Sequence, residues 1–205
     1  MTAASGSVFR AVITAIPFLL PLFFQLGFGW TAAQAGAVVI ALFVGNVGIK
    51  PATTPLMRRF GIRTVLLGAV VASAACLVAI AFLQDTTPLP LLLLVLLLSG
   101  IFRSIGFTGY NSVAFADVEP ARMTHANTLM STLQELGAGL GVAVGALLVR
   151  LGDGVTDGAD GPFRVAFVLL AVLLVVPASR RCGWPAPRGT RSRAGQGDRV
   201  SAGRR

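Results

Sequence analysis

Six long apolar stretches follow one another along this chain, and they restrict its fold more than any other feature. They cover residues 9–28, 32–49, 64–83, 89–108, 126–149 and 163–178. A helix needs about 20 largely apolar residues to cross the hydrocarbon of a bilayer, which is about 30 Å thick. The stretches therefore predict an all-α integral membrane protein with six transmembrane helices.

The charged residues support the same class of protein. Only 12% of the 205 residues are charged, and 55% are hydrophobic, whereas a soluble domain is about 25% charged. This composition excludes a cytosolic enzyme. The net charge of +9 is no sign of nucleic-acid binding, because much of it lies beyond the last apolar stretch. We expect a membrane bundle over residues 1–179 and a basic, disordered cytoplasmic tail over residues 180–205.

The basic residues between the stretches predict the orientation of the chain. Lys50, Arg58, Arg59 and Arg63 lie between the second and third stretches, while the gaps on the opposite side carry few cations or balance them with acids. Lys and Arg are retained on the cytoplasmic side of a membrane. We therefore expect a multi-pass protein of the plasma (inner) membrane with both termini in the cytoplasm.

Two of the stretches carry small residues at four-residue spacing. They are Ala37, Ala41 and Gly45 in the second stretch and Gly137, Gly141 and Gly145 in the fifth. Lipid gives helices no hydrophobic reason to associate, so close backbone approach must supply the attraction, and ridges of small residues permit it. The two ridges predict helix-packing faces, although glycine and alanine are also simply abundant in this chain.

The first and fourth stretches instead carry helix-interrupting or polar residues. Pro17 and Pro21 remove backbone hydrogen bonds, which a membrane helix tolerates beside neighbouring helices or a wet cavity. Arg103 lies deep in the fourth stretch, where an arginine costs at least about 2.5–3.5 kcal/mol and needs a partner. Glu135 is predicted at a similar depth and is the expected partner. Alternatively, Arg103 reaches the inner headgroups and Glu135 is a structural counter-ion.

These features together resemble one half of a major facilitator superfamily transporter. A stretch with polar or helix-interrupting residues, a stretch with a ridge of small residues and a purely apolar stretch follow one another in this order twice. The same order is expected of the 3+3 repeat of such a half. Residues 54–63 are similar to the family's G-x-x-x-D-R-x-G-R-R cytoplasmic loop motif, with Arg59, Gly61 and Arg63 matching. Residues 15–27, 102–108 and 111–140 are similar to the C-terminal halves of multidrug drug:proton antiporters. Glu135 departs from that pattern, where glutamine is common.

The resemblance implies a function and an arrangement of the helices. The first and fourth helices would line a substrate cavity, the second and fifth would meet another half, and the third and sixth would face lipid. The chain would be the C-terminal half of a proton-coupled efflux transporter for amphipathic, often cationic small molecules. Phe18, Phe107 and Tyr110 would stack on the substrate, while the expected polar contacts and coupling groups are Gln25, Arg103, Asn111 and Glu135.

A half alone supplies one wall of such a site, so the resemblance implies a second six-helix half or a homodimer. The chain could equally be a truncated fragment, or a non-transporting assembly or regulatory subunit. An enzyme is not favoured, because the single histidine, His125, supports neither a metal cluster nor a catalytic triad. We expect no metal and no cofactor, and we interpret the acidic residues 153–160 as a flexible loop.

Overall fold

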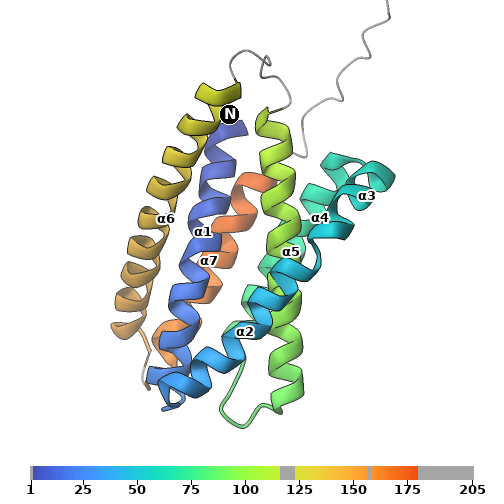
Figure 1. Ribbon diagram of the computed structural model, residues 1–205. Helices are drawn as coiled ribbons and strands as arrows, with labels where there is room; N and C mark the ends of the chain where they lie inside the picture. Colours follow the sequence, from blue (N-terminus) through green and yellow to red (C-terminus); the bar gives the residue numbers. More distant parts are fainter. Residues whose placement is uncertain (1, 116–122, 157, 180–205) are drawn as a thin grey trace, which may run out of the picture.

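The computed structural model describes residues 2–115, 123–156 and 158–179, which form a bundle of helices (Figure 1). The predicted tail, residues 180–205, lies outside the described residues. The helices are α1 (Thr2–Leu22), continued by the π-helix η1 (Phe23–Gly27), then α2 (Ala32–Gly48), α3 (Lys50–Phe60), α4 (Ile62–Ala81), α5 (Leu89–Phe115), α6 (Met123–Asp153) and α7 (Gly161–Ser179).

Each of the six apolar stretches coincides with a helix. Four of the helical segments are long and apolar enough to cross a membrane, namely Phe9–Gly27, Ile62–Ala81, Leu89–Val113 and Asn127–Asp153. The pair α2 and α3 makes a fifth if it is taken as one span, bent by 50°, and the apolar part of α7, Gly161–Val175, is shorter. The predicted all-α membrane fold is confirmed.

The stretch expected to be a cytoplasmic loop is instead mostly helical. Residues 54–60 belong to α3, and the chain turns into α4 at Gly61, whose φ is 79° and ψ is 143°. A side chain is strained in this backbone region, which only glycine adopts freely. The glycine of the loop motif therefore forms the corner between α3 and α4.

Replacement of Gly61 tests this corner. We expect Gly61→Ala to lower the free energy of unfolding by about 1–3 kcal/mol, because a Cβ disfavours the positive φ. Thermal unfolding of the purified chain in detergent measures the change. Gly68→Ala is the control, since Gly68 lies inside α4 with open space around its Cα, and there alanine stabilises a helix. Equal effects of the two changes would contradict the assignment of Gly61 as a strained corner.

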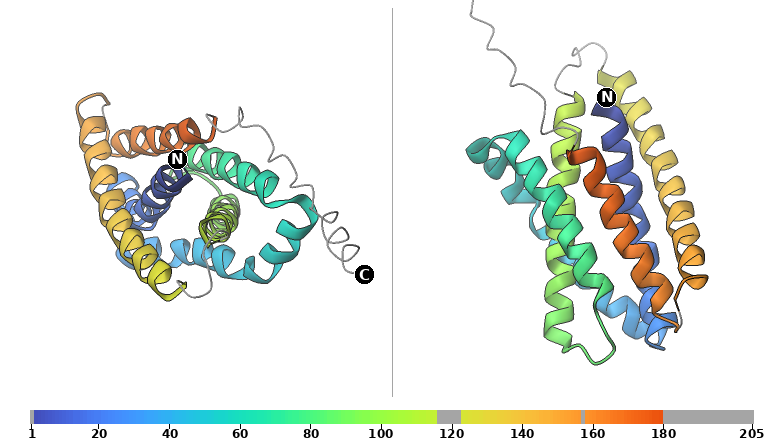
Figure 2. Two further views of the ribbon diagram at one scale, coloured as in Figure 1. Left: turned by 90° about the horizontal axis from the view of Figure 1, so that it is seen from above. Right: turned by 180° about the vertical axis from the view of Figure 1, so that it is seen from behind.

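Two helices lie inside the bundle. Seen from above in Figure 2, α5 is viewed end-on near the middle with α1 beside it, and the remaining helices surround them. The core cluster includes Val12, Ile16, Leu19 and Leu20 of α1, all at most 1% exposed. Beyond the first three residues of α4, the exposed residues of α4 and α7 are small or aliphatic, as in Val71, Val78 and Val172, which suits helices that contact lipid on one face.

The small-residue ridges pack inside this bundle. A Cβ at Gly141 of α6 would collide with the backbone carbonyl of Ala11 in α1, and one at Gly145 would lie 3.1 Å from Leu19 Cδ1. Gly45 of α2 lies against the backbone of Leu97 in α5. Ala37 is exposed, Ala41 is half-buried, and Gly137 is buried with no neighbour near its Cβ position.

Gly100 of α5 is a close-approach position that the four-residue spacing did not reveal. It lies against the carbonyl of Leu42 and the amide nitrogen of Asn46. The contacts of Gly45 and Gly100 are reciprocal, so α2 and α5 meet with backbone against backbone.

Aromatic rings fill the end of the bundle where α1 passes into η1. Phe23 is fully buried, and the centroid of its ring lies 4.7 Å from Phe28, 5.8 Å from Phe163 and 5.5 Å from Phe167. The last two belong to α7, so this cluster joins η1 to α7.

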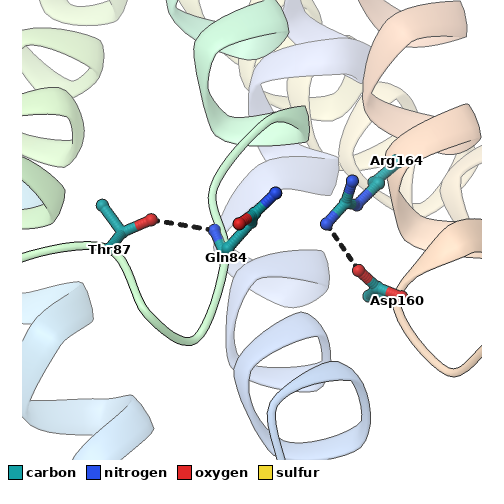
Figure 3. A network of polar contacts seen from close by, with 4 residues as sticks. All are labelled: Gln84, Thr87, Asp160 and Arg164. Carbon is teal, nitrogen blue, oxygen red and sulfur yellow. Dashed lines mark hydrogen bonds and ion pairs between the residues drawn. The ribbon is translucent and has the colours of Figure 1, made fainter.

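The same end carries the turns that connect α4 to α5 and α6 to α7 (Figure 3). The backbone N–H of Gln84 donates to Thr87 Oγ1 at 2.9 Å. Arg164 Nη2 lies 2.6 Å from Asp160 Oδ2 at the start of α7. Asp160 of the acidic stretch is thus paired with an arginine in the first turn of the helix that follows it.

Candidate functional site

A cavity of about 680 Å³ lies beside α5 in the half of the bundle that contains α3. Most of its polar lining comes from α5, through Arg103, Ser104, Thr108, Asn111 and Ser112. The remaining lining residues are Phe107 of α5, Ile13 of α1, Asn46 of α2, and Lys50, Thr53 and Thr54 of α3. Ligand sites in proteins commonly enclose about 300–1,000 Å³, so the cavity has room for a small molecule.

Arg103 is the most buried charged side chain of this lining. It lies one residue past the midpoint of α5 and is 5% exposed. Its Nη2 donates a hydrogen bond to the backbone carbonyl of Ile13 at 2.7 Å. Its Nε and Nη1 are buried and make no hydrogen bond among the described residues. The guanidinium is therefore held by one hydrogen bond, through Nη2, and its other two nitrogens make none among the described residues.

The sequence of α1 explains why that carbonyl is available. In a helix the carbonyl of Ile13 would accept from the N–H of the residue four positions later. That residue is Pro17, which has no N–H. Proline thus frees an acceptor inside the bundle, and Arg103 binds it. Pro17 of the first stretch and Arg103 of the fourth therefore act at one site, the carbonyl of Ile13.

Three of the hydroxyl groups of the lining are engaged with backbone carbonyls. Ser104 Oγ donates to the carbonyl of Asn46 at 2.8 Å, which links α5 to α2. Thr108 Oγ1 donates to the carbonyl of Ser104 at 3.0 Å, and Thr53 Oγ1 to that of Ile49 at 2.9 Å. These three hydroxyl groups are therefore not free to donate to a ligand, whereas the arginine, the lysine and the side-chain amides of the lining carry further donors.

A second arginine lies behind the cavity wall. Arg10 of α1 is 7% exposed, and it donates hydrogen bonds to Asn111 Oδ1 and, at 3.2 Å, to Met130 Sδ. Its guanidinium carbon is 5.6 Å from the centroid of the Phe107 ring. Gln134 Nε2 also reaches Asn111 Oδ1, at 3.5 Å. Asn111 thereby connects α5 to both α1 and α6.

The expected ion pair between Arg103 and Glu135 is wrong. Glu135 is exposed on α6, and the contact of Arg103 is to the Ile13 carbonyl. Neither Arg103 nor Arg10 has a carboxylate partner among the described residues. The predicted depth of Glu135 was reasonable, but the rotation of α6 turns its side chain away from the bundle, while the preceding residue, Gln134, approaches α5.

The other predicted site residues divide into two groups. Arg103, Phe107 and Asn111 line the cavity. Gln25 lies in η1 at the far end of α1, and Tyr110 is 8% exposed and packs with its ring centroid 4.8 Å from that of Phe9. Neither lines the cavity, and neither does Phe18.

The sequence interpretation missed Arg10 and the residues of α3. An arginine near the start of the first stretch resembled the charge that commonly precedes a membrane helix, so its burial was not foreseen. Lys50, Thr53 and Thr54 had been placed in or next to a loop, and only the helical continuation of α2 brings them to the cavity. In the loop motif itself, Arg59 lies over the Phe60 ring at 5.6 Å, and Arg63 is exposed at the start of α4.

Comparisons with known proteins agree with this architecture. The family model described as Major Facilitator Superfamily matches residues 2–193. A probable transport protein, HsrA of Haemophilus influenzae, is 30% identical over 69% of this chain and 31% of its own length. A putative multidrug resistance protein, MdtD of Yersinia enterocolitica, is 28% identical over 85% of this chain and 38% of its own length. MdtD of Salmonella paratyphi B is 29% identical over 80% of the chain and 36% of its own length. The chain thus spans about a third of the length of these relatives.

Proposed function

Because this chain belongs to the Major Facilitator Superfamily, we propose that it is the C-terminal half of a multidrug-type transporter that exports amphipathic small molecules in exchange for protons. The described residues supply one wall of a transport site. We propose that a second six-helix half, or a second copy of this chain, supplies the other wall. This arrangement follows the alternating access of such transporters, in which two bundles rock around a site near the bilayer midplane.

The cavity on α5 is the observation that carries this proposal. Polar residues inside a membrane bundle are expensive, and they mark substrate or ion pathways. Here Arg103 sits near the middle of a 27-residue helix, and polar residues of two other helices, α2 and α3, line the same cavity. A lining that served only to pack helices would not require a buried charge beside a cavity of this size.

The charge distribution supports the proposed orientation. Lys50, Arg58 and Arg59 belong to α3 and Arg63 to the first turn of α4. Helix α3 lies toward the end of the bundle where α1 begins (Figure 1), and the acids of the turns, Asp85 and Asp160 among them, lie at the other end. By the positive-inside rule, we propose that the basic end and both termini face the cytoplasm of a plasma (inner) membrane. The described cavity lining contains no carboxylate, so we propose that the proton-coupling acid comes from the other half.

Expression of the chain with and without a partner half tests the transport function. The partner is the N-terminal half of an MdtD relative, and both are produced in a bacterial strain that lacks its own drug exporters. We expect the pair to increase tolerance to amphipathic drugs and the rate of dye export, while either half alone matches the empty vector. Collapse of the proton gradient with an ionophore should then stop the export.

Two outcomes would contradict this proposal, and another would select the second copy of this chain as the other wall. If the pair also matches the empty vector while both halves reach the membrane, the chain is not a transporter half. If the chain alone exports as well as the pair, it works as a homodimer. If crosslinking from a cysteine introduced at exposed Gly139 captures a single heterologous membrane protein without any export, the chain is an assembly or regulatory subunit.

A further inference from the structure

The guanidinium of Arg103 has two donor groups that meet no acceptor among the described residues. Nε and Nη1 are buried and unpaired, whereas Nη2 is bound to Ile13. A guanidinium presents its N–H groups in a rigid fork that matches the two oxygens of a carboxylate or phosphate. Unmade hydrogen bonds of a buried charge are costly, more so than those of a neutral group. Arg103 is itself part of the cavity lining, and because both nitrogens are closed off from solvent here, an acceptor in the cavity reaches them once the side chain rotates.

Among the residues that the structure describes, no nearby acid balances the positive charge around the cavity. Lys50 lines the cavity as a second cation, and Arg10 lies behind Asn111 and Phe107. Among the described acids, Glu135 is exposed on α6, and Asp85, Asp153 and Asp160 lie at the opposite end of the bundle. The described side chains therefore contribute a positive potential to the cavity, and a low-dielectric surrounding strengthens it.

Apolar side chains complete the lining and indicate what the anion is attached to. Ile13 and Phe107 both line the cavity, and Phe107 is 37% exposed. An aromatic ring and an aliphatic side chain beside a cationic fork suit a ligand with an apolar body and an anionic group. The hydroxyl groups of Thr53 and Thr108 already donate to backbone carbonyls. They can therefore offer a ligand only the lone pairs of their oxygens, which accept hydrogen bonds.

We infer that this cavity binds amphipathic organic anions, with the anionic group held by Arg103 and Lys50 and the apolar body against Ile13 and Phe107. The inference rests on the proposed transport function only for its biological role, since binding is a property of the described wall. It reverses the sequence-based expectation of often cationic substrates, because a cation would meet two positive side chains and no carboxylate in this lining. The anionic group could belong to a dissolved carboxylate or to the phosphate of an acidic lipid, which present the same chemistry.

Binding of three probes with one ring system tests the inference. Naphthoate, naphthamide and naphthyltrimethylammonium differ in charge and share the apolar body. The full chain is placed in nanodiscs of phosphatidylcholine, and calorimetric titration is corrected with empty nanodiscs. We expect naphthoate to bind about tenfold to a hundredfold more tightly than the neutral amide, as for a hydrogen bond to a charged group, and the cationic probe to bind most weakly.

Variants locate the preference. In Arg103→Gln the advantage of naphthoate over naphthamide should disappear while naphthamide still binds. Lys50→Gln should reduce that advantage in part, and because Lys50 is exposed this variant remains informative if the first one does not fold. The matched control is Arg150→Gln, which removes an exposed arginine at the far end of α6 and should leave all three affinities unchanged.

A wild-type protein that binds the cationic probe as tightly as naphthoate would overturn the inference, and so would a folded Arg103→Gln protein that keeps the preference. Failure of all three probes to bind overturns it as well. Repeating the titration in nanodiscs with phosphatidylglycerol separates the two sources of the anion, since a lipid occupant should weaken naphthoate in wild type and not in Arg103→Gln. Anion binding without export by the paired halves would refute the transport proposal alone, whereas export without anion preference would refute this inference alone.

Discussion

Gly141→Val is expected to destabilise the chain by about 3 kcal/mol, at the upper end of the cost of overpacking a well-packed interior. The new side chain would meet the backbone carbonyl of Ala11, and a backbone atom cannot rotate aside as a side chain can. Helices α1 and α6 would have to separate, and with them the contacts that Gly145 makes to Leu19. Because no hydrophobic force holds helices together in lipid, little would compensate for the lost contact.

Thermal unfolding in detergent measures this effect, and we expect the midpoint to fall by about 6–12 °C. Gly139→Val is the matched control, because Gly139 lies two residues away on the same helix and nothing approaches its Cβ position. Gly139→Val removes the same backbone flexibility and adds the same side-chain volume as Gly141→Val. If the two variants unfold at the same temperature, the close approach of α6 to α1 is not what stabilises this part of the bundle.

Phe23→Ala is expected to cost about 3 kcal/mol, the lower end of the range for truncating a buried phenylalanine. The side chain is fully buried among the rings of Phe28, Phe163 and Phe167, so its removal leaves a cavity between η1 and α7. We expect a cost at the lower end of this range because water does not surround the unpacked ring in a membrane. The free energy lost is then mainly that of the dispersion contacts.

The unfolding midpoint again measures the change, with Phe82→Ala as the control. Phe82 is 70% exposed, so its truncation should shift the midpoint little. A larger effect at Phe82 than at Phe23 would contradict the assignment of the aromatic cluster as the contact between η1 and α7.

The helices could be predicted from the sequence because the thickness of the bilayer fixes how many apolar residues each needs. The depth of a residue follows from the same count, and Arg103 does lie near the middle of α5. The face of a helix on which a residue lies is harder to predict, since successive residues are turned by about 100°. Gln134 and Glu135 show this, because only the first approaches α5.

The spacing of the small residues predicted packing faces but not the helices that pack against them. A ridge of glycines identifies a face that permits close approach, but it does not say which helix approaches. Gly141 and Gly45 pack on α1 and α5 of the same bundle, where the resemblance had implied contact with another half. Lys50, Thr53 and Thr54 could not be foreseen as cavity residues, because their placement depends on a helix that bends by 50° after α2 and continues.

The dependence of Arg103 on Pro17 joins two positions that lie far apart in the sequence. The proline withholds an N–H from Ile13, and the arginine supplies one in its place. A chain that regained the N–H at position 17 would give the Ile13 carbonyl a second donor, and one that lost the arginine would leave that carbonyl without any. The break in one helix and the charge on another thus meet at a single carbonyl, so a substitution at either position changes the hydrogen bonding at the other.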